Sequence, residues 1–598
     1  MGAVPVRDAD PIASDRPSRR SSRVIRNASN AAATRDVPFG FADVAVTLGV
    51  LTLLATIAKV GAGAFVPFTA KIVPHVDLDP RNLPYYAARS TLRMFVALVW
   101  STLFTLVYGY FAARSKRAER VLIPLLDILQ SVPVLGYLSV IITAFIALFR
   151  GSLLGLEFAA IFAIFTSQVW NMTFSFYQSL KSIPYELQEA AALYRLSGWQ
   201  RFVQLDVPFA TIGLVWNAMI SFGGGWFFLA ASEAITVLNH NYTLPGVGSY
   251  VAAAIAAQDM SALGWAIVTI AVVIVLVDQL FWRPVVAWAD RFRFEQSAAA
   301  EAPRSWVFDV IRAANVPVLL GRALAPAADS VGRLLSAVTD ARFALRRPAG
   351  EGTRGERLFN AAVIGVVIVL CAVALRFILT TVGFGEIPKV FGLGLATMAR
   401  VAVLVAFATI VWTPIGVAIG FNPRLASTLQ PVVQFLSSFP ANFIFPFATL
   451  AFIRLGVPIN LGAILLMALG SQWYILFNAI AGAQSVPTDL REMCDDCDLQ
   501  GWRRWRRLIV PGIFASLVTG AITASGGAWN ASIVSEVVSW GGTTLTATGL
   551  GTYITEATTG GDWPRIILGV SMMSVFVVAV NRMVWRPLYG YAQKRFTQ

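Results

Sequence analysis

Few residues in this sequence have the type and spacing for metal or redox chemistry. Cys494 and Cys497 form a C-x-x-C pair, a spacing found in zinc sites and in dithiol redox centres. A structural zinc site needs four ligands, and no further cysteine or histidine lies near this pair in the sequence. We therefore expect no metal site and a packing role for Cys494. His240 is expected to be a surface polar residue of an outer loop without a specific role, and contact with a solute or a binding protein is the alternative.

Two carboxylates are the strongest candidates for transport chemistry. Glu233 and Glu536 each follow a serine, Ser232 and Ser535, at the end of an apolar run. An ionisable residue at membrane depth is commonly functional, so these four residues are candidates for the lining or the gate of a solute path. The alternative is that each carboxylate lies at the outer edge, where it is hydrated or caps a neighbouring helix.

Catalytic chemistry has no candidate residues in this sequence. Two histidines and no acidic or Cys-His cluster provide no catalytic constellation. The G-x-x-x-x-G-K-[ST] pattern that cradles phosphate groups does not occur. We expect no catalytic residue and no cofactor in this chain, so that any ATP and Mg²⁺ must be bound by separate subunits.

Composition places the chain in a lipid bilayer. Of its 598 residues, 57% are hydrophobic and 13% are charged, and the mean hydropathy is +0.66. The net charge of +14 comes from arginines that lie between apolar runs, and not from a basic stripe with interleaved aromatics, so we expect no nucleic acid partner. Basic loops stay on the inside. We therefore expect a multi-pass protein of the bacterial cytoplasmic (inner) membrane with both termini in the cytoplasm.

Apolar runs separated by charged breaks predict an all-α membrane protein with about 12 transmembrane helices. The expected spans are 41–66, 92–113, 121–149, 153–178, 209–232 and 262–282, then 358–382, 396–420, 427–453, 460–482, 512–537 and 564–584. Pro133 and Pro440 interrupt the third and ninth spans, which we expect to be kinked or broken.

The sequence contains one unit written twice. At a constant offset of 303, Trp226 matches Trp529, and the register runs without a gap from Trp170 and Trp473 to Pro284 and Pro587. Upstream the offset is 307, as in Arg93 with Arg400, so a four-residue insertion lies in or near the fourth span. With six helices each, both halves enter from the cytoplasm and form parallel repeats.

One stretch in each repeat breaks the apolar pattern. Residues 181–208 and 484–511 each contain a Ser-x-Pro, mixed polar and small residues, a Gly-Trp pair, basic residues and a closing proline. Proline suits the first turn of a helix. In each stretch the pattern predicts a pair of short helices on the cytoplasmic surface. The two helices of a pair are joined at Gly198 in the first stretch and at Gly501 in the second.

The first stretch resembles the EAA motif of permeases of binding-protein-dependent ABC importers, and further segments such as LPGVGSYVAAAIAAQD resemble the nitrate/sulfonate/taurine branch. The resemblance implies the type I importer permease fold, with 184–199 and 487–502 as coupling helices that dock on two ATPase subunits, and a periplasmic or extracytoplasmic solute-binding protein. The residues implied in coupling are Pro184, Glu189, Ala190, Ala191, Gly198, Trp199 and Pro208, and Pro487, Glu492, Cys494, Gly501, Trp502 and Pro511.

Both copies depart from the family pattern. The glycine usual six positions after the glutamate is Arg195 in one copy and Asp498 in the other, and both copies have a glycine three residues later. We expect the turn to have moved to Gly198 and Gly501. The opposite charges predict two different docking surfaces.

The expected organisation is a disordered basic leader (1–40), a first permease domain (41–284), a cytoplasmic linker (285–357) and a second permease domain (358–598). The linker is expected to carry surface helices at the membrane interface, with a regulatory or ATPase-docking role as the alternative. The resemblance implies a small anion such as nitrate, sulfonate or bicarbonate. Ferric iron or thiamine remains an alternative substrate, and a secondary transporter an alternative class.

Overall fold

A computed structural model describes residues 40–63, 76–237, 240–292, 305–344, 353–540 and 542–596. Almost all of the expected leader, and residues 293–304 and 345–352 of the expected linker, lie outside the described residues. The domain boundaries therefore stay a prediction.

In the described ranges, the first half and the linker consist of helices with one short hairpin. In chain order these elements are α2 (Phe41–Ala62), η2 (Pro80–Asn82), α3 (Leu83–Arg114), α4 (Lys116–Ser131), α5 (Val134–Leu148), α6 (Leu154–Lys181), α7 (Tyr185–Leu193), α8 (Gly198–Arg201), η3 (Phe202–Asp206), α9 (Val207–Glu233), β1 (Ala234–Val237), β2 (His240–Thr243), α10 (Val247–Ala257), α11 (Met260–Val277), η4 (Asp278–Trp282), α12 (Arg283–Ala289), η5 (Asp290–Phe292), α13 (Trp306–Ala313) and α14 (Val316–Ala344).

The second half repeats this order of elements. It comprises α15 (Thr353–Thr381), α16 (Glu386–Phe421), α17 (Pro423–Ser438), η6 (Ala441–Phe443), α18 (Phe445–Leu455), α19 (Ile459–Ser485), α20 (Thr488–Asp496), α21 (Gly501–Arg504), η7 (Trp505–Ile509), α22 (Val510–Ser535), β3 (Val537–Trp540), β4 (Thr543–Thr546), α23 (Leu550–Gly560), α24 (Trp563–Val580), η8 (Asn581–Trp585) and α25 (Arg586–Phe596).

The structure confirms the repeat element by element. The bounds of α7, α8, β1, β2, α10 and α11 recur 303 residues later in α20, α21, β3, β4, α23 and α24. The offset changes at the connection between α5 and α6, where five residues correspond to a shorter turn between α18 and α19. The inserted residues therefore lie just before the fourth span, as the sequence predicts.

Each half is built around one central helix. Helix α6 lies between α3 and α9, and α19 lies between α16 and α22. The matched tryptophans Trp226 and Trp529 are both buried in these cores. The two antiparallel hairpins, β1–β2 and β3–β4, follow α9 and α22 directly.

One helix of each half packs against the other half. Helix α5 packs against α22, α23 and α24 of the second half, and α17 packs against α9 and α11 of the first. The main-chain N–H of Val134 donates to Asn530 Oδ1 at 2.9 Å, and Arg586 pairs with Asp127 at 2.8 Å. A core that draws on both halves fixes their relative position.

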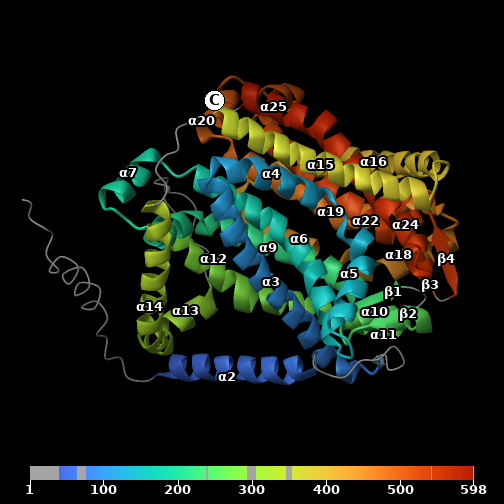
Figure 1. Ribbon diagram of the computed structural model, residues 1–598, viewed down its shortest axis with the longest axis horizontal. Helices are drawn as coiled ribbons and strands as arrows, with labels where there is room; N and C mark the ends of the chain where they lie inside the picture. The colour runs from blue at the N-terminus through green and yellow to red at the C-terminus, as the bar shows by residue number, and fades with distance from the viewer. Residues whose placement is uncertain are drawn as a thin grey trace, which may run out of the picture.

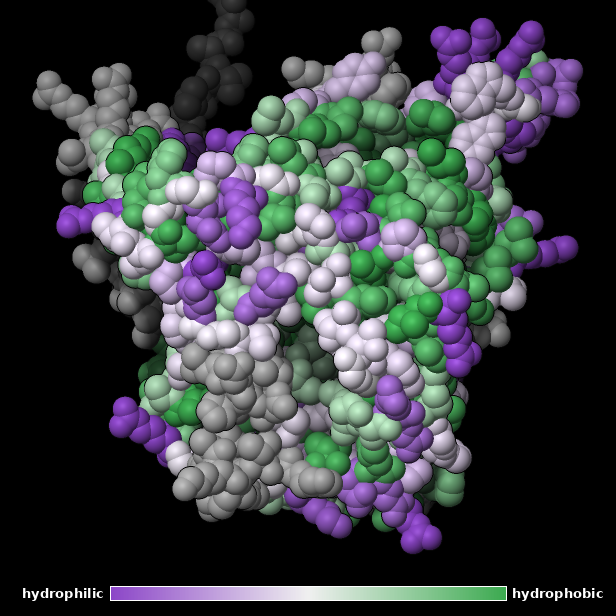
Figure 2. Space-filling view, turned by 90° about the vertical axis from the view of Figure 1, so that its right-hand side faces the viewer, coloured by the Kyte–Doolittle hydropathy of each residue, from purple (hydrophilic) through white to green (hydrophobic). Residues whose placement is uncertain are grey.

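Matched elements of the two halves lie at the same ends of the molecule (Figure 1). The four strands lie at the right-hand end, whereas α7 and α20 lie toward the left. Figure 2 looks onto the strand end and shows hydrophilic residues spread among hydrophobic ones, as expected for a surface in water. The repeats are therefore parallel, as the even number of spans predicts.

Every predicted span coincides with a helix or a helical pair, but the count by length and apolarity is lower than twelve. Among the described residues, nine helices are long and apolar enough to cross a membrane, and ten if the pair Lys116–Gln130 and Val134–Leu148, bent by 88°, is one span. The two predicted spans that do not qualify are 153–178 and 427–453. Helix α6 carries Glu157 and Gln168, and the chain breaks at Pro440 between α17 and α18.

Candidate functional site

The first candidate site is the pair of surface helices α7 and α20. Pro184 and Pro487 are their N-caps, one residue before the first turn in which the sequence pattern places them. Glu189 and Glu492 are exposed. Ala191 and Cys494, by contrast, are buried, with 7% and 3% of their surface exposed. Each helix therefore rests on small residues and presents its glutamate outward.

Cysteine suits this packing position in the second copy. Cys494 lies in an apolar cluster with Val486, Leu508 and Ile509, whereas Cys497 is exposed at the helix end. Ala190 lies between Glu189 and Ala191 in the Glu-Ala-Ala triplet of the first copy and is half-buried. The two cysteines of the C-x-x-C pair thus face different environments.

The turn after each helix corrects one expectation. Arg195 (φ 48°) and Asp498 (φ 49°), at the position of the family's usual glycine, are left-handed, so the helix end has not moved. Of the two glycines three residues later, Gly501 is also left-handed and Gly198 is not. Leu196 N–H donates to Ala191 O at 3.1 Å and Leu499 N–H to Cys494 O at 2.9 Å. These bonds close a Schellman-type helix end, which requires the left-handed residue at that place.

The second of the two surface helices predicted in each stretch is not a separate element. Helices α8 and α21 continue through π-helical turns, η3 and η7, into the long helices α9 and α22. Pro208 and Pro511 lie just beyond these turns. Because a proline ring clashes with the carbonyl four residues earlier, a wider turn accommodates it without ending the helix. In the described parts of the two loops, only α7 and α20 are separate surface helices.

The two junction glycines are expected to respond differently to substitution. Gly501 has a φ of 55°, and Gly198 is not among the residues with positive φ. Gly501→Val should cost about 1–2 kcal/mol, since a β-branched residue strains a left-handed conformation, and Gly198→Val should cost less. Thermal unfolding of the two purified variants measures the difference. Equal losses would show that the φ at Gly501 does not matter.

Each loop is fixed to the membrane helices by a different contact. In the first half Arg114, at the end of α3, pairs with the buried Asp206 in η3. Phe421 and Ile509 take these two places in the second half. There Arg491 lies 4.3 Å from the centre of the Phe421 ring and donates to Val486 O at 2.8 Å. Partial burial, with the positive Arg504 nearby, lowers the pKa of Arg491.

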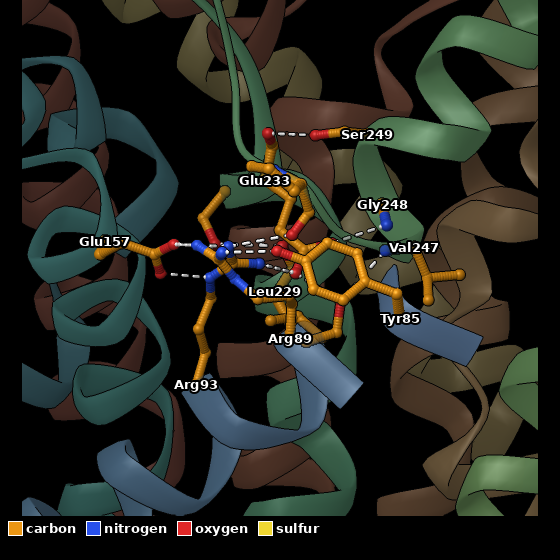
Figure 3. Close-up of polar contacts among 12 residues, drawn as sticks. Tyr85, Arg89, Arg93, Glu157, Leu229, Glu233, Val247, Gly248 and Ser249 are labelled. Carbon is orange, nitrogen blue, oxygen red and sulfur yellow. Dashed lines mark hydrogen bonds and ion pairs between the residues drawn. The ribbon is translucent and has the colours of Figure 1, made fainter. Parts of the chain in front are cut away.

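The second candidate site is the pair of carboxylates, and the first of them lies in a buried ionic network (Figure 3). Glu233 is completely buried, and its Oε1 accepts from Ser90 at 2.5 Å and from Arg93 Nη1 at 2.6 Å. Its Oε2 accepts from the main-chain N–H of Gly248 at 2.7 Å. Arg93 also pairs through Nε with Glu157 Oε2 at 2.6 Å. The network joins α3, α6, α9 and α10.

The second half contains the same arrangement. Glu536 is also completely buried, and its Oε1 accepts from Thr397 and from Arg400 Nη1, both at 2.8 Å. Its Oε2 accepts from the N–H of Gly551 at 2.8 Å. Arg400 Nη2 donates to Asn460 Oδ1 at 2.7 Å. Both glutamates therefore cap a neighbouring helix, α10 or α23, which is the alternative that the sequence left open.

Glycines allow each carboxylate to reach the helix start. A Cβ on Gly246 would collide with the Glu233 carboxyl, and one on Gly549 would collide with that of Glu536. A Cβ on Gly248 would collide with the main chain of Ala230. These close approaches give a physical reason for the spaced glycines of both repeats.

For Glu233, Glu536, Ser232 and Ser535, candidates for the lining or gate of a solute path, the structure favours the alternative of helix capping by the two carboxylates. All four are buried, and Ser232 Oγ donates to Leu229 O at 3.0 Å. Both carboxylates are compensated by an arginine and by main-chain donors, so neither is left to face a solute.

Sequence reasoning missed the basic partners. The signal was present, because Arg93 matches Arg400 at the 307 offset and both lie within predicted spans. An intramembrane arginine needs a buried acidic partner, and the sequence contains a matched pair of carboxylates, Glu233 and Glu536. Glu157 and its counterpart Asn460 could not be found this way because they differ in charge.

The halves meet around a small central cavity. It encloses about 60 Å³ and is lined by glycines and aromatic residues of both halves, with Ser437, Tyr474 and Asn530 as polar groups. The glycines are Gly223, Gly224, Gly470 and Gly527, and the aromatic residues besides Tyr474 are Phe227, Phe228, Phe439, Trp473 and Phe477. None of the lining residues is charged.

Comparison with known proteins gives distant relatives of one kind. The chain is 25% identical over 189 residues to a nitrate import permease protein from Leptolyngbya laminosa, which covers 32% of this chain and 64% of the relative. It is 29% identical over 200 residues to a bicarbonate transport system permease protein from Synechocystis sp., which covers 33% and 66%. The matches thus span slightly less than two thirds of the length of these relatives.

A family signature matches the chain twice. The signature of the binding-protein-dependent transport system inner membrane component covers residues 105–281 and again 412–586, which together are more than half of the chain. Each match includes one surface helix, α7 or α20, and one of the two helix-capping glutamates, Glu233 or Glu536. The chain therefore belongs to the family of binding-protein-dependent transport system inner membrane components, as a tandem ABC permease with two copies of the domain.

Proposed function

We propose that this chain is the translocating subunit of an ATP-driven importer and receives work from two separate ATPase subunits that dock on α7 and α20. The observation that carries the proposal is the pair of nine-residue surface helices, in identical register and at the same end of the molecule. A short helix seated in a partner's groove transmits displacement, whereas a flexible loop absorbs it. ATP and Mg²⁺ would be bound by the partner subunits.

The continuous helices provide the mechanical connection. From Gly198 to Glu233 the chain forms one 36-residue helical stretch, and Gly501–Ser535 is its counterpart. The first stretch lines the central cavity with Gly223 and Phe227, and the second with Gly527 and Asn530. A displacement at α7 or α20 would therefore reach the cavity through one rigid element.

The solute path is proposed to run through this cavity between the halves. Its uncharged, partly polar lining favours weak and reversible contacts, because a solute must enter a path and also leave it. The names of the relatives suggest a small anion such as nitrate or bicarbonate as the solute. An extracytoplasmic binding protein would then supply most of the selectivity.

Uptake into proteoliposomes tests this function. The chain, co-purified with its ATPase subunits and supplied with its binding protein, should accumulate labelled nitrate or bicarbonate only when ATP is present on the side of α7 and α20. Sulfonate, ferric iron and thiamine are the comparison solutes. Accumulation that continues without ATP, driven by an ion gradient, would identify a secondary transporter. ATP-dependent uptake of thiamine or ferric iron alone would refute the anion assignment.

A further inference from the structure

The stretches 181–208 and 484–511, which carry α7 and α20, are here called the first and second coupling loops. The linker helix α14 lies against the first of them. Ser336 Oγ is 3.3 Å from Ser197 Oγ, the N-cap of α8. Gly332, one turn earlier, faces the Trp199 ring: a Cβ there would lie 3.5 Å from the indole Nε1. In Figure 1, α14 runs along the left side of the molecule toward α7, roughly across the direction of α2.

The other end of α14 is also held in place. Asp43, in the first turn of α2, accepts hydrogen bonds from the main-chain N–H of Asn315 at 2.5 Å and of Val316 at 3.1 Å. A carboxylate at this place satisfies the free amides of a helix start and interacts favourably with its dipole. Helix α13, just before it, packs against α12 and α2. Helix α14 is therefore a strut between α2 and the first loop.

The second loop has no such neighbour among the described residues. Its matched residues Gly501 and Trp502 are exposed, Trp502 by 76%, whereas Gly198 and Trp199 are half-buried. The linker occurs once in the chain, and its helix α14 covers the first of the two matched loops.

We propose that α14 forms part of the surface that docks the ATPase subunit at the first loop, so that the two ATPase contacts are built differently. This proposal rests on the proposed function. Helix α14 leaves α7 open: Tyr185, Leu193 and Tyr194 are 71%, 83% and 81% exposed. A subunit seated on α7 would thus find α14 beside it and not in its way.

Exposed apolar residues of α14 fall into two groups with different neighbours. Val318, Leu319, Leu320 and Leu324 lie in the half of α14 held by α2, whose own apolar side chains are exposed, as for a lipid-facing helix. Val331 and Leu334 are 54% and 68% exposed and flank Gly332, next to the α8 contact. At about 100° per residue, Leu320, Leu324, Val331 and Leu334 share one face of α14, so the two groups differ in their position along the helix. We assign the part beside α8 to the protein partner and the part beside α2 to lipid.

Photo-crosslinking of the assembled transporter tests the assignment. A photoreactive phenylalanine analogue is placed singly at Leu334, at Leu324 as the matched position on the same helix, and at Leu193 and Met493 on the two coupling helices. We expect ATPase adducts at Leu334, Leu193 and Met493, and none at Leu324. A lipid adduct alone at Leu334, or no adduct there while Leu193 and Met493 react, overturns the inference and leaves the proposed function standing. Failure of both Leu193 and Met493 removes the proposed function as well.

A second variant pair gives a functional readout. Val331→Glu with Leu334→Glu should weaken ATPase binding at one of two sites by roughly tenfold, whereas Leu320→Glu with Leu324→Glu should not. Titration of the purified chain with the ATPase subunit should then show one weakened and one unchanged site. Two equally tight sites in the first variant would contradict the proposal, and the retained second site shows that the chain is folded.

Discussion

Replacing Glu536 by alanine is expected to lower the free energy of unfolding by about 3–5 kcal/mol. The substitution leaves Arg400 buried with Asn460 as a neutral partner and removes the acceptor of the Gly551 N–H. A buried charge without its partner keeps the full cost of leaving water, because no nearby carboxylate compensates it. Chemical unfolding of the purified protein in detergent measures the loss. A change below about 1 kcal/mol would show that water reaches the site.

The first network offers a matched control for this prediction. It contains Arg89 and Glu157 where the second network has Ala396 and Asn460, so that each network has equal numbers of acidic and basic groups. Glu157→Asn alone should be strongly destabilising, since it leaves Arg89 and Arg93 with only one carboxylate between them.

Adding Arg89→Ala to Glu157→Asn should recover most of the lost stability. The double variant recreates the composition that the second half already uses. Coupling between neighbouring charges makes such a pair strongly non-additive. If the double variant is as unstable as the sum of both single variants, charge balance does not control these networks.

Most of the fold was predictable from the repeat, because most elements occur twice in the sequence and could be identified from two matched segments. The 303-residue register in the sequence recurs in the bounds of α7 and α20, and the interruption at Pro133 recurs as the bend between α4 and α5. Hydropathy alone could not give the junction of α8 with α9. Pro208 reads as a boundary in the sequence, and only the π-helical turn η3 makes a continuous helix compatible with it.

The candidate site was predictable where a residue acts locally. The start of α7 at Pro184, within one residue, and the packing of Cys494 follow from helix chemistry and residue size. The pairing of Glu233 with Arg93 spans 140 residues, and the contact of Ser336 with Ser197 spans 139. Such contacts depend on how helices pack in three dimensions, which periodicity does not record.

The double variant Glu189→Ala with Glu492→Ala is expected to nearly abolish solute-stimulated ATP hydrolysis by the assembled transporter. Both carboxylates are exposed on helices whose other side is fixed by Ala191 and Cys494. Among the described residues neither glutamate has an ion-pair partner, so both are available to a basic residue of a partner. Each single variant should lower hydrolysis roughly three- to tenfold, since one loop still transmits force.

The control must separate coupling from stability and from net charge. Glu556→Ala removes an exposed carboxylate from α23, at the opposite end of the molecule, and should leave hydrolysis unchanged. Unfolding of the double variant should match the unsubstituted chain, because α7 and α20 contribute no membrane-spanning segment. Hydrolysis is measured with the ATPase subunits, the binding protein and saturating solute. If the double variant binds its ATPase, hydrolyses ATP and transports normally, then α7 and α20 are not the elements that receive work. In that case the continuous helices from Gly198 and Gly501 to the cavity would have no input to transmit.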